Sequence, residues 1–342
     1  MPAAPSFAIV SLAAAGLVAL AAMLGGGWIW AALGYMTLIA WGFDKLLPQR
    51  VSPVEDARGA DALSATLALV HFPLLGLVAG RLASGGSGFA DWLGVFVAAG
   101  LFFGQVSNAN AHELIHRGNR VLFNLGKWVY ISLLFGHHTS AHLKVHHRFA
   151  ASDEDPNTAR PGESFYAFAP RAWRGSFRRG YEMERADIIR RGTGGATPYV
   201  TYVFGGLGFL ALALAAFGLA GAAVLLALAA HAQTQLLLAD YVQHYGLTRA
   251  RRADGKLEPM GLAHSWNAGE SFTRRLMLNA PLHSDHHAHP ARRYPALALP
   301  ARSEAPRLPA SLPVMTSLAL YPPGWRRVMG RALARWQQES GG

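Results

Sequence analysis

The sequence contains no cysteine and few charged residues: Asp, Glu, Lys and Arg together make up 15% of its 342 residues. The missing thiols exclude disulfides, cysteine-ligated zinc and iron–sulfur clusters, and with them a built-in electron carrier of the rubredoxin type. Any redox chemistry performed by this chain therefore requires other metal ligands and a separate electron donor.

Apolar residues dominate instead, at 51% of the sequence, and the mean hydropathy is +0.18. Several apolar runs exceed the length that a soluble core helix needs, which is typical of an integral membrane protein. We interpret residues 1–342 as a single all-α membrane domain without internal repeats. Its predicted spans are six: about 7–24, 27–43, 63–80, 88–110, 199–217 and 220–240.

The charge distribution predicts how these spans are oriented. The net charge is +11, but no nucleic-acid-binding motif is visible, and the arginines flank apolar runs. Segments 142–196 and 244–342 hold ten and fourteen Lys and Arg residues, whereas the predicted outer turns contain only Arg81. The positive-inside rule places both long segments, and both termini, in the cytoplasm. The cytoplasmic parts are then about 111–196 and 244–342.

A seventh apolar run, 121–136, is short and carries Lys127. Since both segments beside it are predicted to be cytoplasmic, the chain must cross the membrane an even number of times between them. We therefore expect an interfacial or re-entrant helix at 121–136.

Histidines cluster at the predicted cytoplasmic ends of the spans. They occur in HELIH (112–116), HLKVHH (142–147), HYG (244–246) and LHSDHHAHP (282–290). Spacings of three, four or five residues place the members of each set on one helical face. The candidate metal ligands are His112, His116, His142, His146, His147, His244, His283, His286 and His287.

Nine imidazoles exceed the needs of one ion, since zinc takes four ligands, or three and a water. Two iron ions with five or six ligands each use nine nitrogens and leave a position open for dioxygen, and imidazole suits iron. The sequence thus favours a dinuclear iron centre. HELIH alone also matches the HExxH pattern of zinc peptidases, with Glu113 as base, so an intramembrane zinc peptidase is an alternative.

The other histidines carry weaker signals. Three of them either orient metal ligands from outside the site, pack in the core or lie on the surface: His137, His138 and His289. For three more the sequence does not decide between a hydrogen-bonded structural group and a functional one: His71, His231 and His264.

The four histidine elements, with RFAASDEDPNTAR after the second and ARRYPAL after the last, resemble the bacterial membrane alkane 1-monooxygenases of the membrane desaturase and hydroxylase superfamily. The similarity runs from about 88 to 330 and includes YPPGWRRVMG. It implies six membrane helices with a cytoplasmic histidine-rich cap that binds two iron ions through the nine histidines named above. It also implies a multi-pass protein of the bacterial inner membrane.

The implied reaction is hydroxylation of the terminal carbon of an alkane to a 1-alkanol, using dioxygen and electrons from a rubredoxin or ferredoxin-type donor with its reductase. Asp240 replaces the expected Asn, and Gln243 the expected Glu. A xylene-type methyl hydroxylase and a fatty acyl desaturase are alternatives, because the ligands alone do not separate them. The Arg-rich surface, which includes Arg251, Arg252, Arg274 and Arg275, has two alternative interpretations: docking of an acidic electron donor, or membrane topology and contact with anionic lipid.

Overall fold

The computed structural model describes residues 3–49, 51, 53–54, 59–86, 88–192 and 194–340. Regular structure in these ranges is helical. They contain no strand, only two isolated bridges, Arg251 with Leu257 and Asn267 with Arg307. The all-α prediction is therefore confirmed for the part of the chain that is described.

The helical elements follow one another along the chain, and those labelled η are π-helical or 3₁₀ turns. In chain order they are α1 (Ala3–Leu24), α2 (Gly27–Gly34), η1 (Tyr35–Ile39), α3 (Ala40–Leu46), α4 (Ala60–Ala83), α5 (Phe89–Phe102), η2 (Phe103–Ser107), α6 (Asn108–Ile115), α7 (Arg120–Ser132), α8 (His138–Ala141), η3 (His142–His146), α9 (His147–Phe149), α10 (Phe165–Arg191), α11 (Tyr199–Gln243), η4 (Leu262–His264), α12 (Ser271–Leu276), α13 (His283–Ala288), η5 (Tyr294–Ala296), α14 (Leu312–Ala319) and α15 (Pro322–Ser340).

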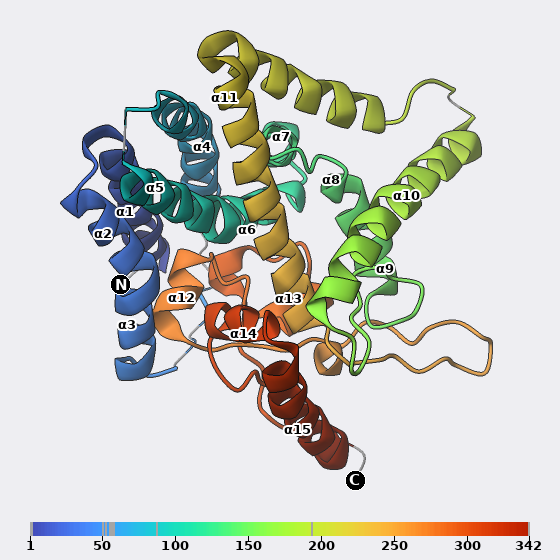
Figure 1. Ribbon diagram of the computed structural model, residues 1–342. Helices are drawn as coiled ribbons and strands as arrows, with labels where there is room; N and C mark the ends of the chain where they lie inside the picture. The colour runs from blue at the N-terminus through green and yellow to red at the C-terminus, as the bar shows by residue number, and fades with distance from the viewer. Residues whose placement is uncertain are drawn as a thin grey trace.

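Four helical stretches are long and apolar enough to cross a membrane: Pro5–Leu24, Ala60–Ala83, Phe89–Ile115 and Tyr199–Gln243. The last is α11, whose 45 residues correspond to about 68 Å of α-helix, twice the thickness of a bilayer core. Its helical geometry breaks at Gly218, where φ is 67° and ψ is −167°. Figure 1 shows the two halves of α11 meeting at a sharp angle, the first running across the top and the second descending through the centre.

Each predicted span coincides with a helix, and the predicted division of 199–240 falls at Gly218. The second span corresponds to the continuous helical run 27–46, which is not among the four candidates. The count of six crossings and the cytoplasmic position of the cap stay predictions.

The run predicted at 121–136 forms α7, and its first turn is capped by the Asn119 side chain, which accepts hydrogen bonds from the backbone amides of Val121 and Leu122. Helix α7 packs closely against α6. A Cβ atom at Gly126 would lie 2.8 Å from the backbone oxygen of Ala111, so a side chain there would push the two helices apart. This contact fixes the position of α6, which carries the HELIH histidines.

Candidate metal centre

Four segments far apart in the sequence bring their histidines together: α6, the turn η3 with α9, the C-terminal end of α11, and α13 (Figure 1). All nine histidines that the sequence singled out lie in two adjacent groups. Within each group, one nitrogen from every member lies within 4.8 Å of the others. We call them the five-histidine group (His112, His116, His142, His147 and His286) and the four-histidine group (His146, His244, His283 and His287).

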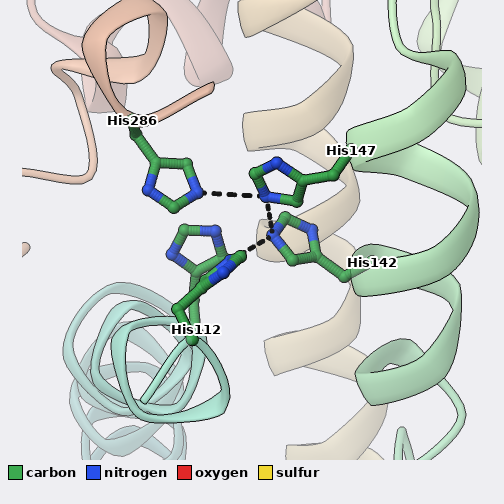
Figure 2. Close-up of side chains that lie close together, drawn as sticks. His112, His142, His147 and His286 are labelled. Atoms are coloured by element: carbon green, nitrogen blue, oxygen red, sulfur yellow. Dashed lines mark hydrogen bonds between the residues drawn. The ribbon is translucent and has the colours of Figure 1, made fainter. Parts of the chain in front are cut away.

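The rings of His112, His142, His147 and His286 face a common centre from three directions, α6, the η3–α9 segment and α13 (Figure 2). The Nε2 atom of His142 lies 3.0 Å from that of His116 and 2.9 Å from that of His147. The Nε2 atoms of His147 and His286 are 3.2 Å apart.

The four-histidine group joins the end of α11 to α13. The Nε2 atom of His283 lies 2.9 Å from that of His244 and 3.1 Å from that of His287. The ring of His146 stands 4.6 Å from the ring of His244, centroid to centroid. The two groups touch, since the rings of His147 and His287 are also 4.6 Å apart.

The HLKVHH histidines lie in the π-helical turn η3 and at the start of α9. His142 and His147 belong to the five-histidine group, while His146 belongs to the other. The rings of His146 and His147 nevertheless lie 5.3 and 4.5 Å from the ring of His142, centroid to centroid, which is consistent with the predicted shared face.

The donor set fits metal ions. Two nitrogens bound at right angles to one ion, each at about 2.1 Å, lie about 3.0 Å apart, close to the separations in both groups. Five buried ring nitrogens of the two groups have no hydrogen-bond partner among the described residues: Nε2 of His112 and His146, and Nδ1 of His142, His244 and His287. Unpaired buried nitrogens are costly unless a ligand occupies them. No carboxylate belongs to either group in the described ranges.

Burial also favours the protonation state that binds metal. Together with the neighbouring imidazoles, it lowers the pKa of seven of these histidines well below the ordinary value of 6.5, namely His116, His142, His147, His244, His283, His286 and His287. These side chains are therefore neutral imidazoles at physiological pH. The pKa of His146 is raised, because the lowering effect of burial is outweighed by the charge and hydrogen bond of Asp155.

Asp155 is a site residue that the sequence analysis missed. Its Oδ2 atom lies 2.9 Å from Nδ1 of His146 and accepts a hydrogen bond from the Thr158 hydroxyl at 2.8 Å. Both partners of the His146 contact are almost completely buried. A carboxylate on the far nitrogen orients a metal-binding imidazole and increases its basicity. The signal in the sequence was the DPNT turn that follows the second histidine element.

Two carboxylates near the histidines belong to neither histidine group and instead form ion pairs and hydrogen bonds with the surrounding protein. Glu113 forms a buried ion pair with Arg117 at 3.1 Å and accepts a hydrogen bond from the backbone amide of Tyr294 at 3.2 Å. Asp285 pairs with Arg292 at 2.6 Å and accepts from the amide of Ala298. Because Glu113 is engaged in this way, the geometry does not favour the zinc-peptidase alternative.

The remaining histidines lie outside both groups. His71 is satisfied on both ring nitrogens by the hydroxyls of Ser107 and Ser132, at 2.9 and 2.8 Å. His137 packs between aromatic rings, and His264 and His289 pair with carboxylates. His138 borders a cavity beside the groups, and His231 lines a separate one.

The cavity beside the groups, which we call the inner cavity, has a volume of about 60 Å³. Its lining includes His112, His142 and His283, so both groups reach it. The rest of the lining is mainly apolar and includes Leu236 and Leu312, while Asp240 is one of its polar residues. The Asp240 carboxylate accepts a hydrogen bond from the side-chain amide of Asn157 at 2.6 Å.

One predicted surface arginine is not on the surface. Arg274 is 5% exposed and donates to the backbone oxygen of Gly269 and the side chain of Asn279. The prediction that Arg274 helps to dock an electron donor is therefore wrong, because the guanidinium holds the turn after α12 in place. Arg251 and Arg252 are exposed as expected.

The fold and the site together define a helical membrane protein with two adjoining groups of buried and half-buried histidines beside a mainly apolar cavity. Residues 90–319 match the family model described as fatty acid desaturase. Alkane 1-monooxygenase 2 of Pseudomonas aeruginosa is 32% identical over 304 residues, which cover 84% of this chain and 78% of the relative. Alkane 1-monooxygenase 1 of Alcanivorax borkumensis is 30% identical over 297 residues, which cover 84% of this chain and 72% of the relative. The alkane 1-monooxygenase of Pseudomonas putida is 31% identical over 294 residues, which cover 84% of this chain and 71% of the relative.

The chain belongs to the fatty acid desaturase family and, within it, to the group of the alkane 1-monooxygenases. It is thus an oxidoreductase of the monooxygenase class, as the sequence analysis predicted.

Proposed function

We propose that this protein is a non-haem di-iron monooxygenase that hydroxylates the terminal carbon of alkanes to 1-alkanols. The observation that carries the proposal is the pair of histidine groups opening on one apolar cavity. The names of the relatives support the alkane as substrate. In the proposed assignment each histidine group binds one iron ion, and all nine histidines are ligands.

Two bound iron ions would supply the redox chemistry that activates dioxygen, which an unactivated C–H bond requires. The protein's own contribution is orientation and the exclusion of water. The apolar side chains of the inner cavity hold an alkyl end beside His112 and His283, and they keep water from the reacting atoms. Asp155 fixes the ring of His146.

Electrons come from a separate carrier, because the sequence contains no cysteine for one of its own. We propose a rubredoxin or ferredoxin-type donor with its reductase, docking on the cytoplasmic side, where exposed arginines such as Arg251 and Arg252 attract an acidic partner. The proposal includes a bacterial inner-membrane protein of one domain, 1–342, with six spans and both termini in the cytoplasm.

The test is the metal content of the detergent-purified protein, followed by turnover of octane and hexadecane under labelled dioxygen with a rubredoxin system. We expect two iron ions per chain and label in the 1-alkanol. His→Ala substitution at each of the nine positions should reduce the iron content, whereas His264→Ala, which lies outside both groups, should not.

One zinc ion and no iron would overturn the proposal. Two iron ions without alkanol would contradict the alkane assignment and direct the search to aromatic methyl or acyl substrates.

A further inference from the structure

A cavity of about 670 Å³ lies between α15 and the segment 302–309, which precedes α14. Three arginines line it: Arg302 and Arg307 from the segment, and Arg335 from α15. We call it the arginine cavity. It shares no lining residue with the inner cavity among the described residues. Figure 1 shows α15 at the end of the structure opposite the bend of α11.

The positive charges of the arginine cavity are not balanced by the protein. The ion pairs of the described residues include none of its three arginines. Glu339 is the one carboxylate residue in the described lining. Burial and the neighbouring charge of Arg302 lower the pKa of Arg307 to about 10, so these two guanidinium groups repel each other. An anion between the arginines would remove this repulsion.

Arg307 also has a buried hydrogen-bond donor that the protein leaves unused. Its Nη2 atom donates to the backbone oxygen of Pro300, whereas its Nη1 atom is buried without a partner among the described residues. A buried, unpaired donor is unfavourable unless a ligand accepts a hydrogen bond from it. The ligand therefore needs acceptor oxygens as well as negative charge.

A phosphate group meets both requirements. Its oxygens accept hydrogen bonds, and the planar fork of a guanidinium group matches them in pairs. The volume of the arginine cavity lies in the range of about 300–1,000 Å³ that is typical of small-molecule sites. The indole of Trp336, which is 7% exposed, gives the cavity an apolar wall for the remainder of a phosphorylated molecule.

The arginine cavity is connected to the histidine groups through Asn267. The backbone oxygen of Asn267 accepts a hydrogen bond from the amide of Leu308 at 2.8 Å. Its side chain accepts from the backbone amide of Ser284 at 3.0 Å and donates to the Ser284 hydroxyl at 2.6 Å. Ser284 lies in the first turn of α13, which carries three of the nine histidines. An anion that joins Arg307 to Arg335 therefore fastens α15 to the segment that supports α13.

We propose that the arginine cavity binds a phosphate group through Arg302, Arg307 and Arg335, and that the bound anion stabilises the packing of α15 against the segment 302–309. The phosphate is free, part of a small molecule or part of a lipid head group, and the chemistry of recognition is the same for all three. The inference does not depend on the proposed function, because it concerns binding and not turnover.

The experiment is calorimetric titration of the full-length, detergent-purified, iron-loaded protein with inorganic phosphate and with glycerophosphate at constant ionic strength. Wild type should bind both, and both should raise its thermal unfolding midpoint as their concentration rises. Arg307→Gln should weaken the binding about tenfold, because a charged hydrogen-bond donor is lost. Arg307→Lys should give a partial loss, since the ammonium group keeps the charge but not the planar fork.

The matched control is Arg331→Gln. Arg331 is exposed on α15 and lies outside the lining, and its removal changes the net charge by the same amount. This variant should bind phosphate as wild type does. Contact of phosphate with the iron would affect all variants equally. Arg302→Gln is a second test variant, because Arg302 is exposed and its removal does not disturb the core.

The site is refuted if wild type gives neither binding heat nor a shift of the midpoint with either probe, or if Arg307→Gln and Arg331→Gln bind phosphate equally well. If Arg307→Gln does not fold, the comparison of Arg302→Gln with Arg331→Gln decides in the same way. Displacement of phosphate by micelles that contain phosphatidylglycerol supports the site with a lipid head group as its ligand. Tighter binding of glycerophosphate without such displacement supports it with a soluble phosphorylated molecule.

Discussion

The hydrogen bond between Asp155 and His146 allows a direct test of how the protein prepares the four-histidine group. The side chains are 1% and 4% exposed, and Oδ2 lies 2.9 Å from Nδ1. Asp155→Ala leaves the ring N–H of His146 buried without an acceptor, which costs about 1–3 kcal/mol. It also frees the ring to rotate, and loss of such an outer partner lowers metal affinity about 10- to 100-fold.

The assay is retention of iron by the purified protein during titration with a chelator, together with turnover. Asp155→Asn should give an intermediate loss, because the amide oxygen still accepts the hydrogen bond while the negative charge is gone. The matched control is Asp153→Ala in the same loop, whose carboxylate is 92% exposed and should not affect iron binding. If Asp155→Ala retains iron as tightly as Asp153→Ala, Asp155 does not orient a metal ligand and the reasoning fails.

Three further predictions address packing, protonation and docking. Gly126→Ala should destabilise the protein by about 1–3 kcal/mol and release iron, because the new methyl group meets the backbone of α6. The control is Gly118→Ala, since the space around Gly118 is open. Equal stability of the two variants would refute the close contact at Gly126. Iron-free protein should lose stability as the pH falls below about 6.5. The pKa of the buried imidazoles is lowered in the folded state, so the unfolded state binds more protons than the folded state as the pH falls. A thermal unfolding midpoint that stays constant between about pH 8 and pH 5 would contradict this. Reduction by the donor should slow with rising ionic strength and in the double variant Arg251→Glu and Arg252→Glu; a salt-independent rate would exclude electrostatic docking.

The sequence by itself determined the chemistry available to this protein. The lack of cysteine, the nine closely spaced histidines and the apolar runs are local properties, and each restricts the possible ligands or the possible environment without any knowledge of the fold. The break at Gly218 was also predictable, because a long apolar run must bend at a residue that tolerates positive φ.

Only the tertiary structure decided how these parts are used. The histidines divide into groups of five and four according to how four separate segments pack, and the spacing of the histidines in the sequence does not show this division. Likewise, Glu113 accepts a hydrogen bond from the backbone amide of Tyr294, 181 residues away, and Asp155 and Arg274 bind their buried partners across turns of the chain. Hydrogen bonding and burial are properties of the packed surroundings, so residue type and spacing alone do not determine them.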